Sequence, residues 1–414
     1  MAARAPGRNA LLFIFITVMI NMIGFGIIIP VMPQLIMDVT GGGLSLAARW
    51  GGILSLVFAA MQFIMLPVMG SLSDKFGRRP VILISLIAYS GDFLILALAP
   101  SILIMLIARL FSGAFAATFA TANAYIADIS SPEKRAANFG LMGAAFGLGF
   151  IIGPALGGLI GEQFGHRAPF FAVAALGFMN FIYGYFFLPE TNPPENRRAF
   201  SWKRANALGA FKEFSKHPAI LPVAGVIFLL ALAQFSFPAV WAYFAEARFG
   251  WTPRDIGLSL MAVGFSAAIV QGGLTRIVIP RIGEKRASYF GVTIAVISYF
   301  GYGVVTEGWM VYALIAFGAL GGFAAPALQG IMSRSVPANA QGELQGAIGA
   351  VNGLAMIIAP VMMTQIFSYF TAPDAPINLP GAPFLVASLL VAIAYIPLAN
   401  AMTHILRSRE ESAA

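Results

Sequence analysis

The sequence contains no cysteine and few charged residues. Of its 414 residues, three are histidine and 10% are charged, whereas 59% are hydrophobic. The lack of cysteine excludes disulfides, thiolate metal sites and a cysteine nucleophile. His166, His217 and His404 share no spacing typical of metal ligands, so we expect no metal and no cofactor. A chain this apolar is not expected to fold in water, and its composition indicates a membrane protein.

Long apolar runs separated by short polar segments make up most of the chain. A helix needs about 20 apolar residues to cross ~30 Å of hydrocarbon, whereas a transmembrane strand is about half as long and alternates in polarity. The runs have the length of helices and do not alternate. We therefore predict an all-α membrane protein with 12 transmembrane helices. Their predicted ranges are 11–37, 50–73, 80–98, 101–126, 137–161, 168–188, 218–245, 255–276, 287–306, 309–332, 343–368 and 382–404.

The predicted helices form two sets of six, separated by the longest polar stretch, residues 189–217. This stretch includes the sequence PPENRR and is typical of a flexible cytosolic linker. We predict an N-terminal six-helix bundle over 1–188 and a C-terminal six-helix bundle with a short cytosolic tail over 218–414. A doubled six-helix unit, with substrate held between the halves, is common in transporters.

The second half carries a faint copy of one connection of the first half. Gly272-Gly273 and the sequence RIGEKR at 281–286 lie between its second and third predicted helices. The matching place in the first half is the glycine-containing and basic segment 70–80. This similarity favours an internal repeat; alternatively, any cytosolic hairpin collects glycine and basic residues.

The basic residues lie mostly in alternate loops. If the N-terminus is cytosolic, only Arg49, Arg167, Arg248 and Arg254 fall on the opposite face of the membrane. The tendency of lysine and arginine to stay on the cytosolic side then places both termini in the cytosol. The net charge of +8 is explained by this topology and does not require a nucleic-acid partner.

The segment Gly70–Pro80, GSLSDKFGRRP, places charged and turn-forming residues between two apolar runs. Charges are costly in hydrocarbon, so the segment is predicted to be a tight cytosolic turn. Gly70 would let two helices pack closely, and Asp74 would face the positively polarised N-terminus of another helix. The turn is therefore interpreted as a latch between helices; alternatively, it is a solvated loop.

Three motifs resemble those of one transporter family. The segment Gly70–Pro80 resembles the loop signature of the major facilitator superfamily, and ARLFSG at 108–113 resembles its fourth-helix motif with an intramembrane arginine. GLMGAAFGLGFIIGPALGG at 140–158 resembles the fifth-helix motif of its drug/proton antiporters with 12 helices. Shorter matches are most similar to the tetracycline-efflux group: FGW at 249–251, EGW at 307–309, ALQG at 327–330 and LQG at 344–346. The resemblance covers nearly the whole chain and implies a multi-pass protein of the bacterial inner membrane.

In the family that this chain resembles, the loop signature forms a cytosolic charge cluster that favours the outward-open state. The resemblance implies such a cluster at Asp74, Arg78 and Asp128, facing an eleventh helix that begins near Glu343. The latch residues implied are Gly70, Asp74, Gly77, Arg78, Arg79, Asp128 and Glu343.

The fifth-helix motif is a series of small residues that includes a proline. Small residues let helix backbones approach, and proline permits a kink. We interpret the series as a transport-specific bend; alternatively, its small residues only pack helices. Its members are Gly140, Gly149, Gly153, Pro154, Gly157 and Gly158.

Two ionisable residues, Asp92 and Arg109, are predicted to lie deep in the membrane. A charge near the bilayer centre costs on the order of 3 kcal/mol, so each should face a wet cavity or a partner. Burial favours neutral Asp92 and a nearby cation favours its charged form, a balance that suits a reversible proton carrier. Arg109 stays charged and is interpreted as a fixed charge near proton transfer. Structural roles for both residues are the open alternative.

Polar and aromatic residues within the predicted spans are candidates for a substrate cavity suited to flat hydrophobic solutes. They are Asn21, Gln62, Tyr89, Asn123, Phe235, Trp241 and Gln271. Tetracycline exporters carry an acid in the first helix, a histidine in the eighth and an acid in the ninth, where this chain has Asn21, Ala267 and Ala295. Amide and methyl groups cannot carry protons, so we expect any proton coupling to run through Asp92, and tetracycline becomes a doubtful substrate.

We predict a secondary active transporter that exports amphipathic or hydrophobic small molecules in exchange for protons by alternating access. The alternative is a facilitator or symporter of another solute or lipid, which the missing acids favour. No enzyme is expected, because no nucleophile–base pair or metal cluster lies at membrane depth. The expected partners are a small-molecule substrate, protons and the lipid bilayer, without nucleic acid, and a monomer suffices.

Overall fold

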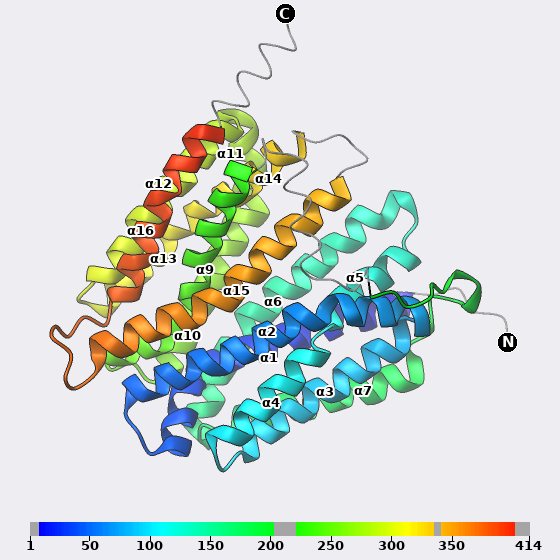
Figure 1. Ribbon diagram of the computed structural model, residues 1–414, viewed down its shortest axis with the longest axis horizontal. Helices are drawn as coiled ribbons and strands as arrows, with labels where there is room; N and C mark the ends of the chain where they lie inside the picture. Colours follow the sequence, from blue (N-terminus) through cyan, green and yellow to red (C-terminus); the bar gives the residue numbers. More distant parts are fainter. Residues whose placement is uncertain (1–7, 203–220, 335–340, 402–414) are drawn as a thin grey trace, which may run out of the picture. The chain divides into compact units, whose positions relative to one another are not determined.

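The computed structural model describes residues 8–202, 221–334 and 341–401 (Figure 1). Every regular element within these ranges is helical. The described ranges contain 12 helices long and apolar enough to cross a membrane, as the sequence predicts. Their bounds are Ala10–Thr40, Leu44–Phe76, Arg78–Leu98, Ile102–Ile129, Glu133–Phe164, Ala168–Phe187, Leu221–Phe249, Pro253–Ile282, Glu284–Val304, Gly308–Arg334, Leu344–Thr371 and Ala382–Ala401.

The structure divides into two compact units. Unit 1 comprises residues 1–43, 53–207 and 251–261, and unit 2 comprises residues 44–52, 208–250 and 262–414. Residues 203–220 lie outside the described residues. The predicted linker over 189–217 includes much of this stretch, so its role as the boundary between two bundles stays a prediction.

Unit 1 is a bundle in which α1 packs along α6 and α3 packs along α7 (Figure 1). Its core contains Phe13, Ile14, Leu86 and Tyr125, all buried. The fourth span is broken between α4 and α5, and Gln62 of α2 donates a hydrogen bond of 3.3 Å to the carbonyl of Ala116 at this break. The helices of the first half of the sequence, of which α2 begins in unit 2, are α1 (Arg8–Thr40), α2 (Leu44–Phe76), α3 (Arg78–Leu98), α4 (Ile102–Phe115), α5 (Thr118–Ile129), α6 (Pro132–Phe164), α7 (Ala168–Phe187) and the short η1 (Pro194–Asn196).

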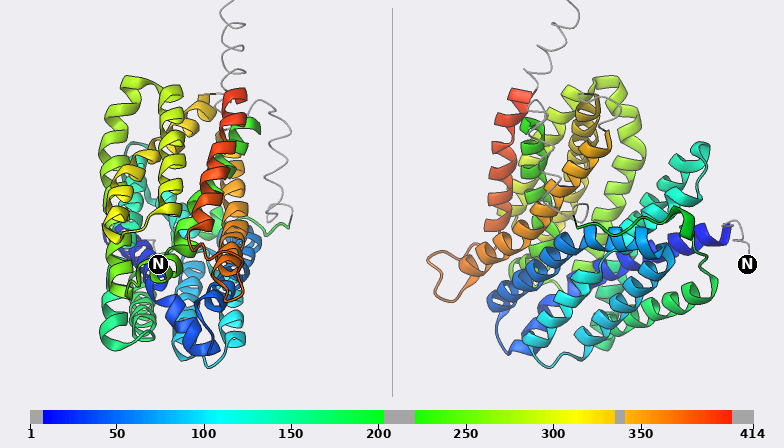
Figure 2. Two further views of the ribbon diagram at one scale, coloured as in Figure 1. Left: turned by 90° about the vertical axis from the view of Figure 1, so that its left-hand side faces the viewer. Right: turned by 45° about the vertical axis from the view of Figure 1, so that its right-hand side comes forward.

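Unit 2 is a second bundle, in which α9 packs along α15 and α12 packs along α16 (Figure 2). Its eighth span contains a π-helical segment and its tenth span a 3-10 segment. Both irregular segments contain a pair of glycines. The elements of the second half of the sequence, of which α10 begins in unit 1, are α9 (Leu221–Phe249), α10 (Pro253–Ile269), η4 (Val270–Leu274), α11 (Thr275–Ile282), α12 (Glu284–Val304), α13 (Gly308–Ala319), η5 (Leu320–Phe323), α14 (Ala324–Arg334), α15 (Gln341–Thr371) and α16 (Ala382–Ile393).

Several helices are longer than the apolar runs that predict them. The helix α2 begins at Leu44 rather than at residue 50, because the segment LSLAAR at 44–49 also folds as helix. Within α2, Ser45 donates a hydrogen bond of 2.8 Å to the carbonyl of Ser368 in α15. Prolines inside α1, α2 and α6 do not end these helices. The predicted range therefore underestimates the length of α2.

Glycines with positive φ recur at matching places in the two halves of the sequence. Gly41 and Gly250, with φ of 66° and 64°, end the first helix of each half. Gly77 and Gly283, with φ of 107° and 80°, connect the second helix of each half to the third. Residues with a side chain rarely adopt such angles, so the repeated glycines support the internal repeat predicted from the sequence.

Candidate functional site

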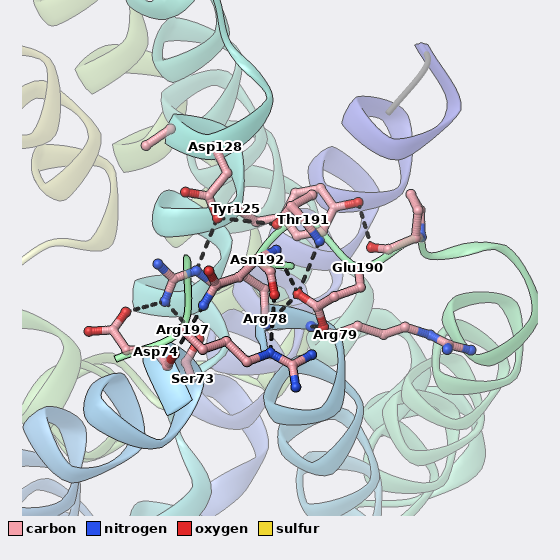
Figure 3. A network of polar contacts seen from close by, with 12 residues as sticks. Ser73, Asp74, Arg78, Arg79, Tyr125, Asp128, Glu190, Thr191, Asn192 and Arg197 are labelled. Carbon is pink, nitrogen blue, oxygen red and sulfur yellow. Dashed lines mark hydrogen bonds and ion pairs between the residues drawn. The ribbon is translucent and has the colours of Figure 1, made fainter. Parts of the chain in front are cut away.

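A charge cluster lies at the turn between α2 and α3 (Figure 3). Arg78 is the first residue of α3, and its guanidinium donates to Asp74 Oδ1 at 2.6 Å and to Asp128 Oδ2 at 3.0 Å. A third bond of 3.1 Å joins it to Ser73 Oγ. Because one guanidinium bridges two carboxylates, it joins the ends of α2, α3 and α5. Unit 1 therefore contains the three-residue cluster that the resemblance implies.

The side chain of Arg79, another predicted latch residue, bonds outside this cluster. Arg79 donates to the carbonyl of Tyr185 at 2.5 Å and lies over its ring. A Cβ placed on Gly70 would meet no atom of the described residues within 4 Å, and the close packing of Gly70 on another helix stays a prediction. The side chain of Glu343 lies outside the described part of the structure.

Sequence reasoning missed Glu190, which follows α7 and lies against the turn. Its carboxylate accepts hydrogen bonds from the backbone N–H groups of Arg78 at 2.8 Å and Arg79 at 3.1 Å. A Cβ on Gly77 would collide with this carboxylate. The available signal was an acid directly after the sixth apolar run, in the sequence LPET.

The fifth-helix motif lies in α6 and packs on two neighbours. A Cβ on Gly149, Gly153 or Gly157 would collide with the backbone of α1. A Cβ on Gly158 would collide with the carbonyl of Pro253 at the start of α10, within unit 1. These glycines permit direct backbone contact between helices.

Pro154 and Gly140, two further members of the motif, differ from its packed glycines in their contacts. Pro154 lies inside an unbroken α6, between Gly26 of α1 and Gly257 of α10, where a Cβ on either glycine would collide with it. A Cβ on Gly140 would meet no atom of the described residues within 4 Å. The tight packing is therefore concentrated in the second half of α6.

Asp92 and Arg109 form an ion pair between α3 and α4 in unit 1. The exposed fraction is 4% for Asp92 and 8% for Arg109, so the pair is shielded from solvent. The Arg109 guanidinium lies over the ring of Phe58, with its carbon 5.3 Å from the centroid. The second carboxylate oxygen of Asp92, Oδ1, is buried and has no hydrogen-bond partner among the residues that the structure describes. The two ionisable residues singled out by the sequence are thus each other's partner.

Most of the cavity candidates in unit 1 bond to backbone. Asn21 donates to the carbonyl of Thr17 at 2.9 Å, and Tyr89 donates to the carbonyl of Ile20 at 2.9 Å. Gln62 bonds to the break in the fourth span, as described above. Asn123 is half-buried on α5. Three of these side chains thus have a backbone partner, and a role for any of the four in a substrate cavity stays a prediction.

The candidates in unit 2 lie apart from one another. Trp241 is completely buried and stacks on Phe237, with ring centroids 4.3 Å apart, beside Tyr302 and Phe384. Phe235 packs against a different cluster, formed by α9 and α15. Gln271 is exposed in η4.

Among the described residues, no group of three or more histidine, cysteine, aspartate or glutamate side chains could hold a metal ion.

Known proteins share both the sequence and the fold of this chain. The sequence model of the Major Facilitator Superfamily matches residues 14–360. The chain is 38% identical to tetracycline resistance protein, class C, from Escherichia coli, over 87% of this chain and 90% of that protein. It is 30% identical to multidrug resistance protein 2 of Bacillus subtilis (strain 168), over 87% and 89% of the two chains.

Solved structures with low sequence identity share the fold. A bacterial homologue of the human lysosomal transporter Spinster, in an inward-facing and unoccupied conformation, superposes with a TM-score of 0.79 at 16% identity, over 96% of this chain and 97% of that chain. The human organic anion transporter MFSD10 gives a TM-score of 0.66 at 21% identity, over 95% and 100% of the two chains. The motifs, the 12 spans and these relatives agree, and the chain is a multi-pass membrane transporter that belongs to the Major Facilitator Superfamily.

Proposed function

We propose that this transporter exports amphipathic or hydrophobic small molecules from the cytosol in exchange for protons. The observation that carries the proposal is the buried ion pair of Asp92 and Arg109. The names of relatives that confer tetracycline or multidrug resistance support a drug-like substrate.

The ion pair gives a physical route to proton coupling. Ionised Asp92 is stabilised by Arg109, whose guanidinium keeps its charge. A proton that binds Asp92 removes that attraction and leaves Arg109 in need of another acceptor, which favours a different arrangement of α3 and α4. Such an exchange between two arrangements, driven by one proton, is what a proton-coupled transporter requires.

The three positions where tetracycline exporters carry titratable residues limit the choice of proton site in this chain. Asn21, Ala267 and Ala295 offer no titratable group, so Asp92 is the proposed proton site. Tetracycline is therefore one test compound among several rather than the expected substrate.

Proteoliposomes with an imposed pH gradient and a trapped pH dye test this proposal. A panel of hydrophobic drugs that includes tetracycline is added to the wild type, to Asp92→Asn and to the matched control Asp38→Asn. Asp38 is an exposed acid that pairs with His166 at the end of α1. We expect a subset of drugs to dissipate the gradient in the wild type and the control but not in Asp92→Asn. Drug flux without proton movement in the wild type would instead favour a facilitator.

We further propose a location in the bacterial inner membrane, with both termini in the cytosol, and a monomer as the transporting species. The distribution of basic residues supports the orientation. The chain has no native cysteine, so single substitutions Lys75→Cys and Asp374→Cys can be labelled with an impermeant maleimide in intact spheroplasts. We expect labelling of Asp374→Cys and protection of Lys75→Cys; the reverse pattern would invert the orientation.

A further inference from the structure

The first turn of α3 receives its cap from a distant segment. Glu190 Oε1 accepts the N–H of Arg78, and Glu190 Oε2 accepts the N–H of Arg79 (Figure 3). Glu190 Oε1 also accepts the N–H groups of Thr191 at 3.0 Å and Asn192 at 2.9 Å. One carboxylate thus satisfies four backbone donors from two segments.

The turn cannot supply this cap itself. The residue before α3 is Gly77, which has no side chain to accept the free N–H groups of the first helical turn. Its φ of 107° disfavours the serine, threonine or aspartate that usually caps a helix. A carboxylate at this end also faces the positive end of the helix dipole. Glu190 therefore replaces the missing cap.

The segment that follows Glu190 bonds to the partners of Arg78. We name residues 190–198 the strap. Thr191 Oγ1 donates to Asp128 Oδ2 at 3.2 Å, and Asn192 Nδ2 donates to the carbonyl of Asp74 at 3.0 Å. The N–H of Arg198 donates to the same carbonyl at 3.2 Å. The strap therefore contacts the backbone on both sides of Gly77 and a carboxylate that Arg78 binds.

We propose that Glu190 is a positioning residue that, through the strap, fixes the turn in the shape in which Arg78 bridges Asp74 and Asp128. Arg78 donates its backbone N–H to Glu190 and its guanidinium to the two aspartates. Loss of the cap releases the backbone from which that guanidinium projects. A loop held only by its own turn would not depend on a side chain more than a hundred residues away.

A spin label on Lys75→Cys tests the strap without any transport assay. Lys75 is exposed in the last turn of α2, and the chain offers a background free of cysteine. The full chain is placed in lipid nanodiscs as wild type, Glu190→Gln, Glu190→Asp and Glu195→Gln. Glu190→Gln keeps the length of the side chain and removes its charge, whereas Glu190→Asp keeps the charge and shortens the side chain. Glu195 is an exposed acid of the same strap and serves as the matched control.

We expect both Glu190 variants to raise the ratio of mobile to immobile label about fivefold, the factor that corresponds to loss of a helix cap worth ~1 kcal/mol. Glu195→Gln should match the wild type. In an Arg78→Gln background the label should already be mobile, and Glu190→Gln should add little, because coupled residues give non-additive effects. Unchanged spectra for both Glu190 variants, or equal loosening by Glu195→Gln, would overturn the proposal.

If Glu190→Gln does not reach the membrane, Asn192→Ala tests the same strap through its bond to Asp74, and an unchanged label spectrum would again count against it.

A second readout is drug export, which rests on the proposed function. We expect the maximal rate to fall in Glu190→Gln with the KM unchanged, because the strap's hydrogen bonds go to the turn and to Asp128, which are not cavity candidates. If the wild type exports no drug while the label responds as expected, the proposed function is contradicted and the positioning role of Glu190 is supported.

Discussion

Arg78 and Glu284 hold matching places in the two halves of the sequence with opposite charge. Each is the first residue of a helix that follows a glycine of positive φ. Arg78 pairs with Asp128 near the end of the fourth span, and Glu284 pairs with Arg334 at the end of the tenth. An ion pair therefore lies at a matching place in each half of the sequence. The basic residue begins the helix in the first half, and the acidic residue begins it in the second.

Reversing one charge of the unit 2 pair is expected to destabilise the protein, and reversing both is expected to restore it. Glu284→Arg or Arg334→Glu places like charges in contact. The Arg334 side chain is 56% exposed, so each single change should cost only about 1 kcal/mol. Thermal unfolding of the purified chain measures this. A double variant no more stable than either single variant would contradict the pairing.

Replacing Gly153 should damage the packing of α6 on α1, whereas replacing Gly140 should not. A methyl group at Gly153 meets the backbone of Ile23, and such overpacking costs about 1–3 kcal/mol. At Gly140 the same methyl group meets no described atom, and alanine favours the helix by roughly 0.5–1 kcal/mol. Unfolding midpoints of the two alanine variants should move in opposite directions. Equal loss in both would show that Gly140 also packs closely.

Trp241→Ala should reduce stability rather than change drug specificity. Its ring is completely buried in the aromatic cluster of unit 2, and truncation of a buried aromatic costs about 3–5 kcal/mol. The control is Trp309→Ala, whose ring is 68% exposed and whose loss should be tolerated. A Trp241→Ala variant of normal stability with an altered KM would place this side chain in the substrate cavity instead.

Arg78→Lys should weaken the turn although the charge is kept. A lysine ammonium is a point charge and cannot reproduce the planar fork that binds Asp74 and Asp128 together. We expect a loss of about 1–2 kcal/mol in unfolding free energy and a lower maximal export rate. Arg79→Lys is the comparison, because the Arg79 guanidinium donates to the carbonyl of Tyr185 and bridges no pair of carboxylates among the described residues, so it should tolerate the change.

The spans could be predicted from the sequence because apolar length identifies a membrane helix wherever it occurs. The cluster of Asp74, Arg78 and Asp128 was expected only from the resemblance of the turn motif to that of a known family, since Asp128 lies in another span and Gly77 separates α2 from α3. Asp92 and Arg109 stood out because a charge in hydrocarbon needs a partner, and the structure pairs them.

Local sequence signals did not predict the contacts of Glu190 and Trp241. The cap on α3 depends on two segments more than a hundred residues apart, and a single acid at the end of an apolar run does not reveal which helix it caps. An aromatic side chain in a span can face a cavity, lipid or a core, and only the rings around Trp241 decide between them. The beginning of α2 was predicted too late, because a bond such as that of Ser45 to the carbonyl of Ser368, within unit 2, joins residues far apart in the sequence.

The central claim, that Asp92 carries the coupled proton, is tested most directly by separating gradient-driven transport from exchange. A drug that dissipates the gradient in the dye assay is loaded into proteoliposomes, and its movement is followed with a pH gradient alone or by counterflow against the unlabelled drug. Asparagine imitates protonated Asp92 in charge and size, so Asp92→Asn should keep counterflow and lose transport driven by the gradient. Asp92→Asn that still concentrates the drug against its gradient at the wild-type rate would contradict the claim.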